Sequence, residues 1–311
     1  MRKMKLALCF ILLAMGFKCI SQIPQAADEL NLLKGASDLH VHTSPDVYQR
    51  SIDDLELARI SKRYGLANLV IKNHVSSTAG RAELVNKTVE GITVYGGLVL
   101  NHALGGINPS AVESMAKLSP KYGKFVWLPT FDSDVQSGTD GIEVLENNQI
   151  NPQLNQILDL VARYNLVLCT GHVSPSAVLT VVEAAAAKGI EKILITHALA
   201  DYPNLNESQL RKLVSLGAKI ELTYLSSIAG PQAHLGFLRN SKQVSIEFMS
   251  GIIKSMGAEH FVLTSDLGQS GNAIPPDGLR IFAENLQQQG ISSEELHTML
   301  VKNPAELLNF E

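Results

Sequence analysis

The chain has 311 residues, of which 45% are hydrophobic and 18% charged, and its formal net charge at pH 7 is −4. This is the composition of a globular protein with enough chain to bury a large core, which excludes a disordered or fibrous chain. The mildly acidic balance gives no electrostatic reason to expect binding to nucleic acid or anionic lipid. The length allows one domain or two, and single α/β barrels commonly reach this size.

The first residues are expected to be a signal peptide. A basic start, "MRKMK", precedes the apolar run "LALCFILLAMGF" at residues 6–17, and small or polar residues follow in "KCISQIPQAA". The apolar run is short for a membrane span and fits a secretory signal. We therefore expect residues 1–21 to direct export, to the periplasm or out of the cell, and we expect no stable membrane span after cleavage.

Export changes the charge and the cysteine count of the mature chain. Loss of the four basic residues of the signal would move the formal charge from −4 to −8. Cys9 and Cys19 lie in this segment, so Cys169 would remain alone and no internal disulfide could form. Cys19 leaves lipid attachment open as an alternative, although Lys18 stands where a small residue normally precedes a lipidated cysteine.

The rest of the chain alternates between short β-prone segments and helical patterns. The β-prone segments are nearly continuous apolar runs, as expected for parallel strands buried on both faces, and they cover residues 37–42, 66–74, 92–101, 124–132, 166–172, 192–198, 218–225 and 260–266. Helical patterns occupy residues 51–65, 108–123, 174–189, 206–217, 245–257, 275–290 and 292–308. Asn108 with Pro109 predicts one helix start, and Ser174 or Ser176 predicts another.

This alternation predicts an α/β fold. Eight strand–helix repeats indicate a single (β/α)8 TIM-type barrel over residues 36–311, with a doubly wound sheet as the alternative. No glycine-rich phosphate loop follows the first strand, which weakens the dinucleotide-binding version of the doubly wound sheet. No low-complexity linker interrupts the chain, so we expect one domain after the signal.

Polar residues gather where the predicted strands end, which is where barrel enzymes build their active sites. Six of the nine histidines fall there, whereas His234, His260 and His297 lie in loop or helix patterns and are expected on the surface. In chain order the strand-end residues are His40, His42, Lys72, His74, Asn101, His102, Thr130, Asp132, His172, His197 and Asp266, while Glu221 and Tyr224 belong to the seventh strand.

The residue types at these ends suit a metal ion. Residues i and i+2 of a strand point the same way, so His40 and His42 could grip one ion. Imidazole and carboxylate ligands suit Zn²⁺, with Mn²⁺ or Fe²⁺ as alternatives. Water bound to such an ion loses a proton near neutral pH and becomes a nucleophile. Asp266 could both hold the metal and accept that proton.

The ordered set of these residues resembles the amidohydrolase superfamily of metal-dependent hydrolases. The resemblance rests on His-x-His in the first strand, single histidines in the fifth and sixth, and an aspartate in the eighth. The C-terminal "NPAELLNF" looks like the closing helix of that group, and "TSDLGQ" followed by "PPDGLRIF" resembles a poorly characterised branch of metal-dependent hydrolases. The resemblance spans about residues 36–310 and implies metal ligands at His40, His42, His172, His197 and Asp266. In the family the sixth-strand histidine binds a second metal or the substrate.

One feature departs from the binuclear members of the superfamily. Their fourth strand often carries a carboxylated lysine or a glutamate that bridges two metals, and "KFVWLPTFD" contains neither. Lys72 could bridge metals as a carbamate, neutralise a substrate anion, or pair with Asp38 or Asp266. Because an unpaired lysine is costly inside a barrel, we favour the charge roles, and with them one metal ion over two.

These considerations assign roles to the strand-end residues. We expect Asp266, His197 and Lys72 to act in catalysis. Lys72, His74, Asn101, His102 and Asp132 are expected to contact the substrate. For Asn101 and His102 a tight turn that requires Gly105 and Gly106 is an equal alternative. Cys169 is expected to be buried and structural.

Three functions remain compatible with the sequence. The leading one is an exported metal-dependent hydrolase that cleaves an amide, ester, lactone or related bond of a small molecule. A metal-dependent phosphoesterase is a second possibility, and decarboxylation or isomerisation on the same scaffold stays open. The third is a barrel that binds a small molecule or metal without turnover. The sequence leaves the substrate and the oligomeric state open, a homo-oligomer included.

Overall fold

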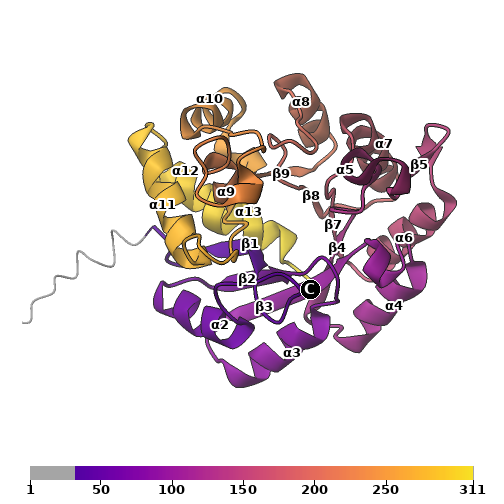
Figure 1. Cartoon of the computed structure of the whole chain (residues 1–311), viewed down its shortest axis with the longest axis horizontal. Helices are drawn as coiled ribbons and strands as arrows, with labels where there is room; N and C mark the ends of the chain where they lie inside the picture. The colour runs from indigo at the N-terminus through magenta and orange to yellow at the C-terminus, as the bar shows by residue number, and fades with distance from the viewer. Residues whose placement is uncertain (1–31, 311) are drawn as a thin grey trace, which may run out of the picture. The chain divides into compact units, whose positions relative to one another are not determined.

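Eight parallel strands lie side by side in the order of the chain, within the residues 32–310 that the computed structural model describes (Figure 1). The strands are β1 (Ser37–His42), β2 (Asn68–Lys72), β3 (Thr93–Val99), β4 (Gly123–Trp127), β7 (Val167–Cys169), β8 (Ile193–Ile195), β9 (Lys219–Thr223) and β10 (Phe261–Thr264). Seven of them fall inside segments that the sequence predicts as strands, and β4 begins one residue before its predicted segment, so the barrel prediction is confirmed. The expected signal peptide, residues 1–21, lies outside the described residues.

Helices surround the strands (Figure 1). They are α2 (Asp54–Arg63), α3 (Ala79–Thr88), α4 (Pro109–Leu118), α5 (Asp134–Ser137), α6 (Pro152–Arg163), α7 (Pro175–Ala187), α8 (Glu207–Ser215), α9 (Tyr224–Ser227), α10 (Ile246–Met256), α11 (Pro275–Gln288), α12 (Ser293–His297) and α13 (Asn303–Leu307). None of them combines the length and apolar character that a membrane span needs, within residues 32–310. A short hairpin, β5 (Leu145–Glu146) with β6 (Gln149–Ile150), precedes α6.

The predicted helix starts follow from local capping. The side chain of Asn108 accepts a hydrogen bond from the N–H of Ala111, and Pro109 fills the first helical position. At α7 the capping side chain is Ser174 rather than Ser176. The predicted helix over residues 292–308 is interrupted by a π-helical turn, Thr298–Lys302, between α12 and α13.

Burial on two sides explains the apolar strands. One set of side chains packs outward against the helices, and a second set from seven strands packs together as a separate cluster. The second cluster includes Phe125, Trp127 and Cys169, which agrees with a buried, structural role for the cysteine. Leu307 joins this cluster and Phe310 packs against it, so the end of the chain covers part of the strand core.

The asparagine of the "NPAELLNF" ending, Asn303, binds the backbone at the start of the last strand. The Asn303 side chain is buried, and its Nδ2 donates hydrogen bonds to the backbone oxygens of Ala258 (2.9 Å) and Phe261 (2.6 Å). These carbonyls lie just before and at the start of β10. Because an unpaired buried carbonyl is costly, Asn303 fixes the last helices to the entry of the last strand.

Backbone hydrogen bonds join the first strand to the last and close the ring. The N–H of Asp266 donates to the carbonyl of His40 (2.9 Å), and the N–H of His42 donates to the carbonyl of Leu267 (2.8 Å). Gly268 follows with a φ of 129°, and a Cβ atom there would lie 1.7 Å from the oxygen of His42. Only glycine permits this approach, because both the backbone angle and the contact exclude a side chain.

We therefore predict that Gly268→Ala destabilises the barrel by about 3 kcal/mol, because the backbone must move to relieve the contact. The matched control is Gly189→Ala. Gly189 also has a positive φ, 75°, but its Cβ would meet nothing within 4 Å. We expect the control to lose about 1 kcal/mol from backbone strain alone. Chemical denaturation of both variants measures the difference, and equal losses would contradict a close contact at Gly268.

Candidate metal centre and active site

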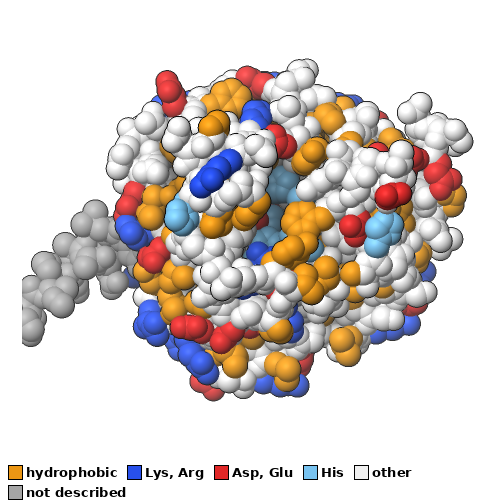
Figure 2. Space-filling model, in the orientation of Figure 1, with side chains coloured by type: hydrophobic (Ala, Val, Ile, Leu, Met, Phe, Trp, Pro, Cys, Tyr) orange, Lys and Arg blue, Asp and Glu red, His pale blue; other side chains and the backbone are white. Residues whose placement is uncertain are grey.

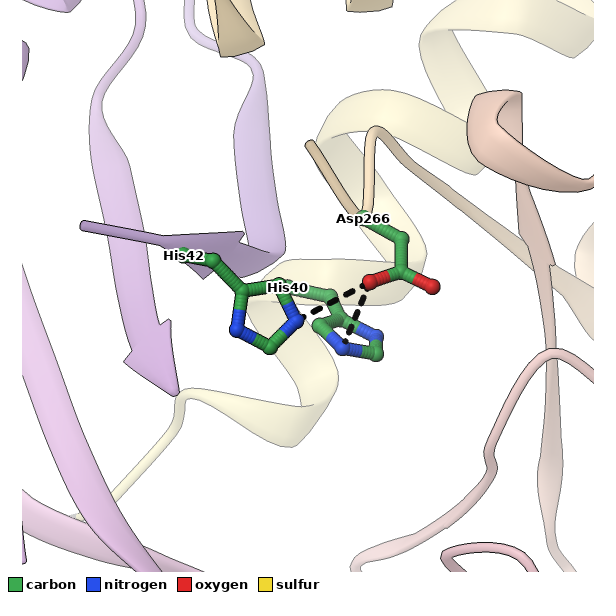
Figure 3. A group of neighbouring side chains, drawn as sticks. All are labelled: His40, His42 and Asp266. Carbon is green, nitrogen blue, oxygen red and sulfur yellow. Dashed lines mark hydrogen bonds and ion pairs between the residues drawn. The ribbon is translucent and has the colours of Figure 1, made fainter. Parts of the chain in front are cut away.

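Three predicted ligands meet where the barrel closes. The Nε2 atoms of His40 and His42 each lie 3.1 Å from Oδ1 of Asp266 (Figure 3). All three residues are buried, and their ligand atoms lie within 4.8 Å of one another, so they could hold a metal ion. The two histidines leave β1 on one side, as their i, i+2 spacing predicts. Two imidazoles and one carboxylate form the donor set that a divalent transition metal prefers.

The buried carboxylate of Glu221 orients His40. His40 Nδ1 lies 3.1 Å from Oε1 of Glu221, and Thr264 donates a hydrogen bond to the same oxygen (2.9 Å). A carboxylate only accepts, so His40 carries its proton on Nδ1 and keeps the Nε2 lone pair for a metal. The other oxygen, Oε2, accepts the N–H of His197 (2.8 Å). Glu221 thus fixes two predicted site residues at once.

Burial keeps the site histidines neutral. It lowers the pKa of His40 to about 3, even though the Asp266 carboxylate opposes that shift. Burial also lowers the pKa values of His42, His74 and His172 well below the usual value, and that of His197 less strongly. A neutral imidazole offers the lone pair that a metal needs, so the site requires no deprotonation of histidine near neutral pH.

Five imidazoles form a ring of contacts around the mouth of the barrel. Neighbouring ring centroids are 5.2 Å apart for His40–His42, 5.0 Å for His42–His74, 6.4 Å for His74–His172, 4.8 Å for His172–His197 and 6.1 Å for His197–His40. The structure therefore brings together residues from β1 and from the segments that follow β2, β7 and β8, as the sequence predicts.

His172 and His197 lie in this ring but outside the three-residue ligand group. Nδ1 of His197 donates to the carbonyl of Tyr202 (2.8 Å), and Nδ1 of His172 contacts Oε1 of Gln136 (2.7 Å). Nε2 of His197 therefore stays free for a metal or a substrate atom. The assignment of both histidines as metal ligands stays a prediction.

Two site residues adopt backbone conformations that L-amino acids rarely occupy. The φ of His197 is 25° and that of Asp266 is 53°, whereas the other described non-glycine residues with positive φ are asparagines. Each lies two residues beyond the end of a barrel strand, His197 after β8 and Asp266 after β10. Strained backbone of this kind persists only where the surrounding structure holds it, and it concentrates at functional sites.

Lys72 is buried beside the ligand group. Its Nζ atom lies 3.1 Å from Nε2 of His40 and 5.7 Å from the centre of the Trp127 ring. Burial lowers its pKa, while Asp266 and then Glu221 oppose that effect. Asp38, one expected partner, is engaged elsewhere, because its Oδ1 accepts the backbone N–H groups of Ser265 and His40.

Three predicted substrate contacts are not brought to the cavity. Asn101 is buried and binds the backbone N–H of Thr130 through Oδ1, and the Thr130 hydroxyl through Nδ2. Asp132 accepts the backbone N–H of the exposed His102 (2.8 Å). Gly105 and Gly106 both have positive φ, so this segment is the tight turn that the sequence leaves as the alternative. The fourth strand accordingly supplies no carboxylate to the ligand group.

A cavity of about 720 Å³ opens over the site. Its lining includes His42, His74, His172, His197, Lys72 and Asp266. Figure 2 shows a hollow near the middle of this face, with histidine side chains inside it and hydrophobic side chains along its rim. The volume is that of a pocket for a small molecule. His42 and Asp266 of the ligand group, with Lys72, His74, His172 and His197, form the polar end of this cavity.

Sequence reasoning assigned no role to two residues that shape this site. Glu221 is a charged residue within an apolar strand, and that contrast could have marked it as a partner of a strand-end histidine. Arg50 lines the cavity, and its Nη2 lies 3.5 Å from Nδ1 of His42. No sequence signal could have identified Arg50, because it lies in a loop whose path depends on the closed barrel.

We predict that Glu221→Gln weakens metal affinity about 10- to 100-fold, because an amide oxygen holds the Nδ1 proton of His40 less strongly than a carboxylate. Titration of the metal-free chain with Zn²⁺ would measure this. The control is Glu247→Gln on the exposed surface of α10, which should bind metal as the unaltered chain does. Equal affinity in both variants would show that Glu221 does not support the site.

One family model matches more than half of the chain. A model described as a family of unknown function (DUF6282) matches residues 35–221, which include His40, Lys72, His172, His197 and Glu221. No curated protein matches the chain at a significant level.

Solved structures resemble the chain over most of its length. An amidohydrolase from Pseudomonas aeruginosa has a TM-score of 0.63 at 12% identity, covering 90% of this chain and 97% of its own. The probable dipeptidase PvdM from Pseudomonas aeruginosa has a TM-score of 0.63 at 10% identity, covering 91% and 97%. An organophosphorus hydrolase from Deinococcus radiodurans has a TM-score of 0.58 at 16% identity, covering 90% and 94%. The chain therefore belongs to the family of unknown function DUF6282, and its barrel has the fold of the amidohydrolase superfamily.

Proposed function

We propose that this protein is an exported metal-dependent hydrolase that cleaves an amide, ester, lactone or related bond of a small molecule. One observation carries the proposal: a buried His40, His42 and Asp266 group lies at the polar end of a cavity large enough for such a substrate. The solved structures with this fold include proteins named as an amidohydrolase, a dipeptidase and an organophosphorus hydrolase. Export rests on the signal-like sequence of residues 1–21.

The residues divide the chemistry among themselves. His40, His42 and Asp266 would hold a divalent ion, and the proposed ion is zinc, which suits this nitrogen and oxygen donor set. When bound, such an ion polarises a carbonyl or phosphoryl oxygen and acidifies a water molecule. Asp266 is placed to accept a proton, because its carboxylate lies at the cavity wall. His197 keeps Nε2 free to hydrogen-bond the substrate, and Lys72 places an amino group beside the reacting centre.

A single ion is the proposed state. The compact ligand group contains three residues, and β4 contributes no bridging carboxylate to it. Lys72 lies against His40, so the alternative is a carboxylated Lys72 that bridges two ions.

The function is tested by metal content and turnover together. We expect the zinc-loaded chain to hydrolyse members of a panel of esters, amides and lactones, and a chelator to abolish that turnover. His40→Ala and Asp266→Ala should lower metal content to background while circular dichroism stays that of a folded barrel. His297→Ala, on the exposed end of α12, serves as the control. Full metal content in both ligand variants would contradict the proposal.

Two outcomes of the same panel point to the alternatives. Turnover confined to phosphoesters, with more than one metal ion per chain, favours a phosphoesterase. No turnover with metal fully loaded favours a barrel that binds a small molecule or metal without reaction.

Lys72→Ala is expected to retain at least one bound ion, because the lysine lies outside the group that holds it. Elemental analysis of the purified variant measures this directly. Complete loss of metal, restored by adding a short carboxylate such as formate, would show instead that a carboxylated Lys72 holds the ions.

A further inference from the structure

The segment that follows β9 builds an apolar wall on the cavity. Ala229, Ala233 and Leu238 are buried there and pack with the partly buried Leu225 and Leu235 as a cluster separate from the main core. Four of these five residues line the cavity, Ala233 being the exception. A hydrophobic cluster that opens into a cavity exposes apolar surface to water there, and an apolar ligand would bury that surface.

The wall is held in place by its own hydrogen bonds. The N–H of Gly230 donates to the carbonyl of Leu238 (2.9 Å), and the N–H of Ala233 donates to the carbonyl of Gly230 (2.8 Å). Nε of Arg239 donates to the carbonyl of Ala233 (3.1 Å). The wall is therefore ordered before any ligand arrives. Phe237, whose surface is 63% exposed, also lines the cavity. A large exposed aromatic side chain at such a cavity is explained if it covers an apolar ligand.

The polar end of the cavity favours an anion. Three basic residues line the cavity, Arg50, Lys72 and Lys242, against two acidic ones, Asp201 and Asp266. Asp266 belongs to the ligand group, and Asp46, outside the lining, forms an ion pair with Arg50. The guanidinium group of Arg50 has five N–H donors in a planar fork that matches a carboxylate.

Arg50 is held in position at this end. Asp46 receives its Nε–H at 2.7 Å, and Nη2 lies 3.5 Å from Nδ1 of His42. The described hydrogen bonds of Arg50 run through Nε and Nη2, which leaves Nη1 for a carboxylate of the substrate.

We propose that the substrate is an amphiphilic anion, with an apolar acyl chain against the wall of residues 225–238 and a carboxylate near Arg50. This deepens the proposed function and rests on it. The bond that breaks joins the acyl carbon to a nitrogen or oxygen of a short carboxylic acid. Water supplies the hydroxyl group to the acyl carbon, and the departing nitrogen or oxygen takes a proton from that water. The products are a fatty acid and a short amino or hydroxy acid.

Binding of probes without a hydrolysable bond tests this class independently of turnover. Octanoate, the fatty acid that an octanoyl substrate would release, joins the chain to an anion, whereas acetate has only the anion and 1-octanol only the chain. Isothermal titration calorimetry on the full chain, with metal content measured in the same sample, should show octanoate binding most tightly. Each added methylene from butanoate to octanoate should tighten binding about fourfold. Equal affinity for octanoate and acetate would overturn the proposal.

Two exposed phenylalanines provide a matched pair of variants. Phe237→Ser should weaken octanoate binding several-fold, whereas Phe248→Ser should leave it unchanged, because Phe248 is 50% exposed on α10 and does not line the cavity. Both residues are exposed enough that the barrel should fold in either variant. Arg50→Gln should reduce the preference for octanoate over 1-octanol, and Arg50→Lys should restore part of it. Equal effects of the two phenylalanine variants would show that octanoate binds outside the proposed wall.

The two proposals fail in different ways. Specific octanoate binding without turnover of any ester or amide would remove the hydrolase and leave the ligand class in place. Metal-dependent turnover of short polar substrates, with no measurable octanoate binding, would remove the ligand class and leave the hydrolase.

Discussion

Closure of the barrel between its first and last strands is the constraint on which the site depends. Two backbone hydrogen bonds place Asp266 beside His40 and Leu267 beside His42, although more than 220 residues separate them in the chain. Gly268 permits this approach because no side chain intervenes. The main chain of paired strands is stiffer than a loop. It therefore fixes the positions of the ligand atoms precisely.

Burying polar residues at the mouth of the barrel costs free energy, and specific hydrogen-bond partners offset that cost. Glu221 satisfies His40 through one oxygen and the backbone of His197 through the other. Lys72 shares Nε2 of His40 with Asp266. These groups bring several hydrogen-bond acceptors together in one small volume. A divalent ion would stabilise this arrangement, because one ion can bind the lone pairs of several ligand atoms at once and a single proton cannot.

The loops add what the strands cannot provide. The segment after β1 brings Arg50 to the ligand group, and the segment after β9 brings an apolar cluster to the same cavity. Barrel enzymes vary chemistry in this way, keeping reactive groups on strand ends and discrimination between substrates on loops. Here the polar residues of the cavity lie mostly at the strand ends, and the apolar ones lie along the segment after β9.

The sequence by itself determined the eight strands, the barrel and the triad of His40, His42 and Asp266, because strand burial and strand-end position are local patterns. It also indicated that Lys72 lies at a strand end beside the candidate ligands. Only the tertiary structure decided that Asn101, His102 and Asp132 stabilise a turn instead of lining the cavity, and that Glu221 and Arg50 support the site. Distances between strand ends and the paths of loops depend on how the ring closes, and no local pattern encodes that.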